Sequence, residues 1–86
     1  MITSRQNPLY KDIKLLQKRR ERESRRQFIV EGKREISRVQ KTDIVKLVVS
    51  NGIDWNDVDC EVIEMAPELI EELTYRGGDA IAIVKM

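Results

Sequence analysis

The chain has 86 residues, of which 41% are apolar and 36% are charged, the composition of one small globular domain with a heavily charged surface. It has no histidine and one cysteine, Cys60, which excludes an internal disulfide, histidine-based catalysis and a zinc site of cysteines and histidines. Its apolar runs are too short for a membrane span or a signal peptide, so we expect a cytoplasmic protein with no membrane partner and no bound metal.

The positive and negative charges are divided between the two halves of the chain. Residues 1–43 carry 13 Lys and Arg against 6 Asp and Glu, a balance of +7, whereas residues 44–86 carry 3 against 9, a balance of −6. The densest basic run, Lys18–Arg26, indicates contact with a polyanion. Nucleic acid is the obvious candidate, because neutralised phosphates release counterions and supply affinity that does not depend on base sequence.

A helix is expected to begin where Asn7 is followed by proline. Asparagine caps helices well, and proline suits the first helical position, where its missing N–H is not needed. Leu9, Ile13 and Leu16 follow at the spacing of a helical apolar stripe, which fades into the basic run. We therefore treat residues 1–26 as a basic N-terminal helical segment. The pattern leaves open whether the helix continues through the basic run or frays within it, and whether the segment is ordered without RNA.

The rest of the chain, residues 27–86, alternates between strand and helix patterns. Ile44–Val49 is the strongest strand signal, β-branched and nearly continuous, as in a buried strand of a parallel sheet. The patterns predict strands over 27–31, 44–49, 61–65 and 80–84, helices over 33–41 and 67–75, and turns or loops over 50–52, 53–59 and 76–79. This alternation predicts a layered α/β domain with a largely parallel sheet.

Few residues point to enzyme chemistry. The chain has no glycine-rich phosphate loop, and Cys60 lies between two acidic residues that disfavour a reactive thiolate. Glu68, Glu71 and Glu72 are expected on the solvated face of a helix rather than in a paired-carboxylate site. Trp55 could stack on a base, but in a chain with a thin core we interpret it as a packing residue.

The basic run has an ordinary interpretation beside the functional one. Glu21 and Glu23 can pair with Arg20, Arg25 or Arg26 along a solvated helix. Two carboxylates cannot balance the six basic residues around them, so the excess charge must be met by solvent or by a partner. Together with the division of charge along the chain, this favours polyanion binding.

Two stretches of the chain match a known family. Residues 4–11, Ser-Arg-Gln-Asn-Pro-Leu-Tyr-Lys, and residues 28–34, Phe-Ile-Val-Glu-Gly-Lys-Arg, resemble the N-terminal substrate-binding domain of the SpoU/TrmH family of RNA 2′-O-ribose methyltransferases. That family opens with Ser-x-x-Asn-Pro-x-x-Lys, continues with a Leu- and Arg-rich helix, and then has Phe-x-Val-Glu-Gly-x-Arg. The spacing here is the same, and the later strands and helix agree more loosely, so the resemblance covers essentially the whole chain.

The resemblance implies a small layered α/β/α sandwich like that of kink-turn-binding ribosomal proteins, and a structured RNA partner, ribosomal or transfer. In such proteins a knotted C-terminal domain binds S-adenosylmethionine, methylates a ribose 2′-hydroxyl and forms the homodimer. We expect that domain after residue 86, because its catalytic and cofactor motifs match no position here. The chain itself, with residues 27–86 as the RNA-binding domain, is then expected to hold no cofactor and no catalytic residue, although its parent would be an enzyme.

The expected RNA contacts come from the two matched stretches and from the basic run between them. Phosphate contacts would supply affinity, and RNA shape and 2′-hydroxyl contacts would supply selectivity. The expected RNA-binding residues are Arg5, Asn7, Lys11, Lys18, Arg19, Arg20, Arg22, Arg25, Arg26, Gly32, Lys33 and Arg34.

Two residues of the second stretch have particular expected roles. Gly32 allows a tight turn from strand to helix with close backbone approach to a ligand, and the cations after it suit phosphate. Glu31 would repel phosphate, and we expect it to hold the turn or to pair with Arg34.

Two alternative functions remain open on the sequence alone. The chain could be a stand-alone RNA-binding protein of the same fold. It could also be a protein-interaction domain whose acidic half docks a basic partner while the basic helix serves solubility, which predicts no affinity for RNA.

Overall fold

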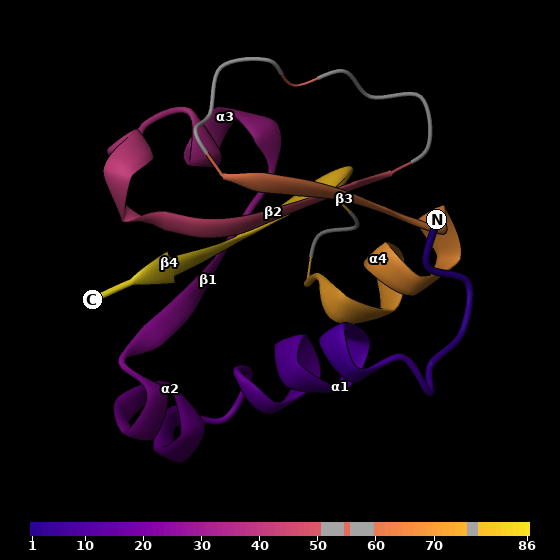
Figure 1. Ribbon diagram of the computed structural model, residues 1–86, viewed down its shortest axis with the longest axis horizontal. Helices are drawn as coiled ribbons and strands as arrows, with labels where there is room; N and C mark the ends of the chain where they lie inside the picture. Colours follow the sequence, from indigo (N-terminus) through magenta and orange to yellow (C-terminus); the bar gives the residue numbers. More distant parts are fainter. Residues whose placement is uncertain (51–54, 56–59, 76–77) are drawn as a thin grey trace.

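A four-stranded sheet lies between two layers of helix (Figure 1). This computed structural model describes residues 1–50, 55, 60–75 and 78–86. The expectation of a layered α/β/α sandwich is confirmed. The turn expected at residues 51–52, most of the loop expected over 53–59, and residues 76–77 of the last expected turn lie outside the described residues.

The elements follow the predicted order closely. They are α1 (Pro8–Leu15), α2 (Arg19–Arg25), β1 (Gln27–Glu31), α3 (Lys33–Ile36), the 3-10 helix η1 (Lys41–Asp43), β2 (Ile44–Ser50), β3 (Glu61–Met65), α4 (Pro67–Leu73) and β4 (Ala80–Lys85). Each of the four predicted strands is confirmed, with ends that differ by at most one residue.

The expectation of a largely parallel sheet is wrong. The spatial order is β1-β4-β2-β3, and β4 runs antiparallel to both of its neighbours, so only β2 and β3 form a parallel pair among the described residues. The reason is the connection between β3 and β4. Through α4 it brings the chain back to the edge of the sheet where β2 and β3 end, with Ala80 opposite Val49, so β4 runs in the opposite direction.

One face of the sheet is covered by α1 and α4. Its inward residues alternate along β4, where Ile81 and Ile83 point to this layer. The core on this side includes Tyr10, Ile13, Leu16, Val48, Met65, Leu69, Ile70, Leu73, Ile81 and Ile83. Helix α1 thus supplies part of the central core, and the basic N-terminal segment packs against the sheet as far as Leu16.

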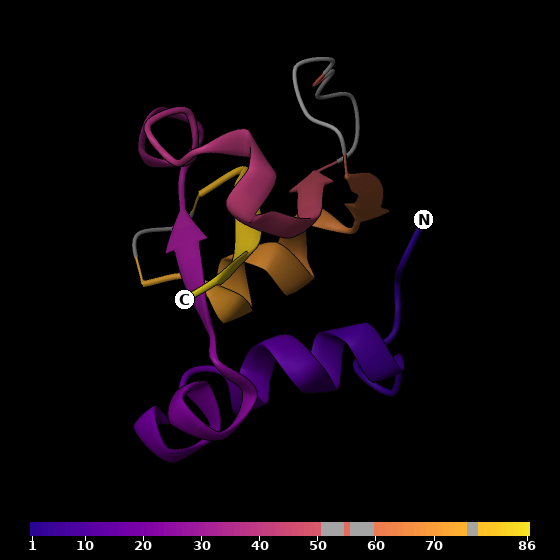
Figure 2. The same cartoon turned by 60° about the vertical axis from the view of Figure 1, so that its left-hand side comes forward.

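The opposite face is covered by α3 and the segment that follows it (Figure 2). Here β4 presents Ala80 and Ala82, small side chains that let this layer lie close to the sheet. Trp55 and Cys60 pack against this core while staying half-buried, which confirms the interpretation of Trp55 as a packing residue.

The helix expected over residues 33–41 is shorter than predicted. Helix α3 ends at Ile36, and Ser37 caps it with its hydroxyl donating to the Arg34 carbonyl at 2.7 Å. Such a hydroxyl offers the backbone an alternative to the next helical turn. Ile36 and Val39 still face the same core, so the apolar spacing predicted their face correctly but not the length of the helix.

The N-terminus is fastened to the far edge of the sheet. The Ile2 N–H donates to the Glu64 carbonyl at 2.8 Å, and the Ala66 N–H donates to the Ile2 carbonyl at 2.8 Å. Residue 2 thus extends the sheet beyond β3 in parallel with Met65. No sequence pattern predicted this bridge, because one residue carries no periodicity.

Burial of α4 against the sheet generates a stability prediction. Ile70 is fully buried, so Ile70→Ala should lower the free energy of unfolding by about 2–5 kcal/mol, since truncation leaves a cavity. Val62→Ala, on the exposed side of β3, should cost less than about 1 kcal/mol. Urea denaturation followed by circular dichroism measures both, and equal losses would contradict the described core.

Candidate nucleic-acid interface

The basic run forms a helix of its own. The chain leaves the helical conformation at Lys18, whose backbone is extended, and α2 then carries the charges with none of its residues buried. Figure 1 shows α2 beyond the lower end of β1, separate from α1. The question that the periodicity left open is therefore answered by two helices with a break between them.

Arg22 holds the break together. Its Nη1 donates to the Leu16 carbonyl at 3.2 Å and to the Gln17 carbonyl at 2.9 Å, which are carbonyls that a helix end leaves without backbone partners. Charged donors make such bonds stronger than neutral ones. Arg22 therefore has a structural task that the sequence pattern did not reveal.

Two further arginines of α2 are held in ion pairs. Arg19 pairs with Glu23 at 3.1 Å, and Arg25 pairs with Asp12 at 3.2 Å and with Glu21 at 3.5 Å. Glu23 was expected to pair with Arg20, Arg25 or Arg26, and it pairs with Arg19 instead. Because these pairs are exposed, they contribute little to stability and leave both guanidinium groups accessible to a stronger partner.

The remaining cations of the run point to solvent. Within the described part of the chain, the side chains of Lys18, Arg20 and Arg26 have no ion-pair or hydrogen-bond partner. Arg26 also closes α2 in the left-handed conformation, with φ of 55°. A non-glycine residue there costs roughly 1–2 kcal/mol, so Arg26 occupies a position where glycine would be more stable.

The first matched stretch has mainly structural contacts. The Asn7 side chain accepts a hydrogen bond from the Leu9 N–H at 2.9 Å, which confirms the helix cap, and Pro8 takes the first helical position. Lys11 is exposed on α1. Arg5 is held by α4, because its Nε donates to Glu72 Oε1 at 2.7 Å and its Nη2 pairs with the other carboxylate oxygen.

Glu72 was expected only to lie on the solvated face of a helix, but its carboxylate also accepts hydrogen bonds from side chains outside α4. The Tyr10 hydroxyl also donates to its carboxylate, at 3.0 Å. The hydrogen bond from Arg5 is the main reason why the pKa of Glu72 is lowered to about 2. The pKa of Tyr10 is raised, mainly because the side chain is buried and next because its hydroxyl bonds to Glu72. This cluster fastens the first matched stretch to α4.

The second matched stretch forms the turn between β1 and α3. Gly32 has φ of 90° and donates its N–H to the Ala80 carbonyl at 3.0 Å, so the conformation that requires glycine is present. Lys33 lies over the Trp55 ring at 5.9 Å, and Arg34 is exposed. Glu31 does not pair with Arg34 but accepts a hydrogen bond from the Tyr75 N–H at 2.7 Å, holding the segment after α4.

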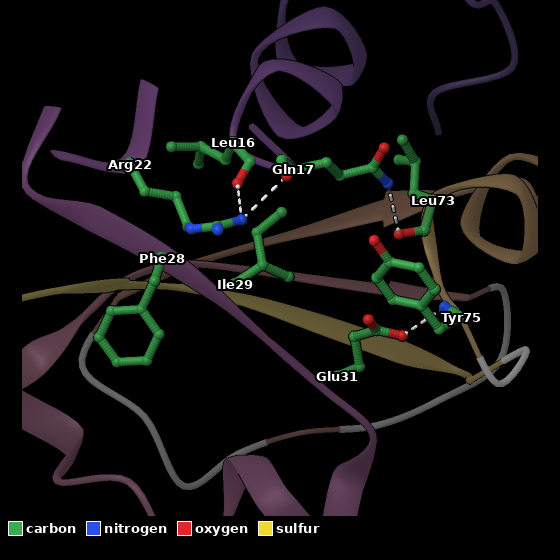
Figure 3. Close-up of a pocket in the computed structure, with 8 residues that line it drawn as sticks. All are labelled: Leu16, Gln17, Arg22, Phe28, Ile29, Glu31, Leu73 and Tyr75. Carbon is green, nitrogen blue, oxygen red and sulfur yellow. Dashed lines mark hydrogen bonds between the residues drawn. The ribbon is translucent and has the colours of Figure 1, made fainter. Parts of the chain in front are cut away.

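The expected contacts do not form one patch. Helix α2 and the Gly32 turn lie at opposite ends of β1, whose five residues span about 17 Å. A ligand that touches both ends must follow this edge strand. Between them lies a groove of about 260 Å³, lined by Leu16, Gln17, Arg22, Phe28, Ile29, Glu31, Leu73 and Tyr75 (Figure 3). Sequence reasoning missed Tyr75, for which a tyrosine beside a Gly-Gly turn was the only signal.

The described residues hold no group of three or more Asp, Glu and Cys side chains arranged to bind a metal ion. No helix in the part of the chain that the structure describes has the length and apolarity to cross a membrane.

Comparison with known proteins places the chain in a family. The model of the MRM3-like substrate binding domain matches residues 7–79. The chain belongs to the MRM3-like substrate binding domain family. This membership confirms the resemblance to the substrate-binding domain of SpoU/TrmH enzymes. No curated protein was found that matches the chain.

Solved structures of methyltransferases share the fold of this MRM3-like domain. An RNA 2′-O ribose methyltransferase is 29% identical to this chain in sequence and superposes with a TM-score of 0.83. The match covers 99% of this chain and 37% of the methyltransferase. The SpoU methyltransferase AviRb from Streptomyces viridochromogenes, solved with AdoMet, is 25% identical with a TM-score of 0.78, covering 94% and 36%. An rRNA methyltransferase from Sinorhizobium meliloti, 22% identical with a TM-score of 0.75, shares the fold over 99% and 36%. The chain thus spans little more than a third of these proteins.

The two roles of arginine in α2 can be separated by stability measurements. Arg22→Ala should lower the free energy of unfolding by about 1–3 kcal/mol, because it leaves two helix-end carbonyls without their charged donor. Arg20→Ala removes the same charge from an exposed side chain that has no partner among the described residues, and it should change stability by less than about 0.5 kcal/mol. Similar values for the two variants in urea denaturation would show that Arg22 does not cap α1.

The Glu72 cluster predicts a dependence of stability on pH. Because the folded pKa of Glu72 is lowered from 4.5 to about 2, the ionised carboxylate stabilises the fold above about pH 4.5, and this contribution is lost as the pH falls toward 2. Thermal unfolding of the wild type and of Glu72→Gln between pH 2 and 7 should show a wild-type advantage at neutral pH that shrinks below pH 4.5. An advantage that stays constant over this range would contradict the assignment.

Proposed function

We propose that this MRM3-like domain recognises structured RNA, ribosomal or transfer, for an S-adenosylmethionine-dependent RNA 2′-O-ribose methyltransferase. The observation that carries the proposal is the group of cations on and beside α2 that have no partner among the described residues, in a domain whose family is named for substrate binding. Phosphates of folded RNA would meet Lys18, Arg20 and Arg26 directly, and would compete with carboxylates for Arg19 and Arg25.

Residues from the whole N-terminal half of the chain contribute to the proposed RNA-binding surface. Residues 1–26 and 27–86 act as one binding unit, because the buried side of α1 belongs to the same core as the sheet. Arg5, Asn7 and Arg22 then serve mainly to position the surface, whereas Lys11, Lys33 and Arg34 widen its positive field.

The chemical step belongs, in our proposal, to another domain of the parent protein. That domain would bind S-adenosylmethionine, supply the catalytic residues and form the homodimer. AviRb, a SpoU relative of more than twice this length, was solved with AdoMet, which supports the choice of cofactor. The residues of this chain match none of the family's catalytic or cofactor motifs, so we assign it recognition without catalysis.

Replacing two cations of α2 tests the proposal. The double variant Arg19→Ala and Arg20→Ala should weaken binding to a structured ribosomal RNA fragment and flatten the dependence of log K on log salt by about 2, because two phosphate contacts are lost. Fluorescence anisotropy across a salt series measures both quantities. An unchanged affinity would remove α2 from the interface.

A matched control carries the same change in charge elsewhere. Arg38→Ala with Lys41→Ala removes two cations from the α3 side of the molecule and should reduce affinity much less. Duplex DNA of equal length serves as the competing ligand. Tighter binding to RNA supports recognition, equal weak binding to both shows charge attraction alone, and no binding to either favours a protein-interaction domain.

A further inference from the structure

We propose that the groove beside β1 binds a single unpaired nucleobase of the RNA, with Tyr75 as its stacking surface. The inference rests on the proposed RNA-binding function and names the part of the substrate that this surface selects. It centres on Tyr75, which lies outside the RNA-binding residues expected from the sequence, and it accounts for the space between the two ends of β1.

Tyr75 is exceptional among the aromatic residues of the chain. Its side chain is 87% exposed, whereas Tyr10 is buried and Phe28 and Trp55 pack against the sheet. Its backbone N–H donates to the Glu31 carboxylate at 2.7 Å, which joins the residue to the end of β1. An exposed ring beside the groove suits a stacking platform, because its face is open to a base.

The groove has an apolar floor and a polar rim. Leu16, Ile29 and Leu73 form the floor, between α1, β1 and α4. Figure 3 shows the side chains of Tyr75 and Glu31 next to each other at one end and Arg22 at the other, with Ile29 between them. The groove has a volume of about 260 Å³, which has room for a flat ring system. A more open hollow of about 590 Å³ shares Ile29, Glu31 and Tyr75 with it, which leaves space for the rest of the nucleotide.

The rim favours a base over other flat ligands because of its charges. The Glu31 carboxylate uses one hydrogen bond for Tyr75 and keeps further acceptor capacity, which suits the exocyclic amines of guanine, adenine and cytosine. A carboxylate would repel a phosphate in the same place. The phosphates that flank the base would instead meet the exposed cations of α2, which lies at the Arg22 end of the groove. The negative end of the groove would thus face the amine edge of the base, and its positive end would face the phosphates.

The base must be unpaired to reach this site. In an RNA duplex the major groove is too narrow and deep for side chains, and the faces of the bases are covered by their neighbours in the stack. Only a bulged or looped nucleotide exposes a ring face to Tyr75 and an amine edge to Glu31. The groove therefore selects folded RNA with an unpaired nucleotide rather than a continuous duplex.

The test compares two RNA hairpins in which a non-nucleotide linker replaces the loop nucleotides, one fully paired and one with a single-guanosine bulge, by fluorescence anisotropy on the full 86-residue chain. The wild type should bind the bulged hairpin more tightly. Tyr75→Ala should weaken binding to the bulged hairpin by about 5- to 100-fold, the loss expected for one stacked base, and leave the paired hairpin within about 2-fold. Tyr75→Phe, which keeps the ring face, should retain wild-type affinity for both.

A second variant tests the role of the carboxylate. Glu31→Gln keeps an acceptor for the Tyr75 N–H but removes the negative charge. A bulged uridine, which lacks an exocyclic amine, should bind the wild type more weakly than a bulged guanosine, and Glu31→Gln should reduce that difference.

The outcomes separate this inference from the proposed function. If the Arg19 and Arg20 double variant weakens binding but Tyr75→Ala does not, or if Tyr75→Ala weakens both hairpins equally, the base site is wrong and the RNA-binding function stands. If the wild type binds neither hairpin, the proposed function and the base site are both overturned. Circular dichroism of each variant shows whether a loss reflects unfolding, and the exposure of Tyr75 predicts that it does not.

Discussion

The arrangement depends on one strand, β4, which lies inside the sheet and is buried on both faces. It pairs with β1 and β2 at once, and alternate residues serve the two helical layers. The isoleucines on one side and the alanines on the other set how far each layer stands from the sheet. Both helical layers and the edge strand β1 are placed by this strand: α1 and α4 cover its isoleucines, α3 covers its alanines, and β1 pairs with it at the edge of the sheet.

That open edge explains why the positive charge of the chain matters. Helix α2 precedes β1 and lies outside both core layers. Among the described residues, its cations form ion pairs with the carboxylates of Asp12, Glu21 and Glu23 alone. Arg22 is used to join α2 to α1, and the rest of the run faces outward. The arginines of one basic run therefore have two roles: Arg22 bonds to the end of α1, and the others present positive charge at the surface. The spacing of the arginines along the chain does not distinguish these roles.

The sequence predicted the elements better than their arrangement. Strands were found because β-branched runs such as Ile44–Val49 carry a local signal, and the cap at Asn7 follows from chemistry within three residues. The antiparallel course of β4 could not be predicted, since it depends on the edge of the sheet to which the connection through α4 leads, and no local pattern indicates that edge. The site was predicted only in its charged parts. The bond from Arg5 to Glu72 and the groove beside Tyr75 join residues more than 40 positions apart, and neither contact leaves a periodic trace.

The spatial order of the strands also bears on how this domain folds during synthesis. Strand β4 is the last strand of this domain in chain order, yet it lies between β1 and β2, so β1 has no strand to pair with until β4 has been made. While the ribosome is still adding residues, the nascent chain can form local helices such as α1, but the central strand that carries Ile81 and Ile83 is still missing from the sheet that covers their apolar sides. A polypeptide that emerges with its basic half first, in the neighbourhood of ribosomal RNA, therefore stays open until almost every residue of this domain has been translated.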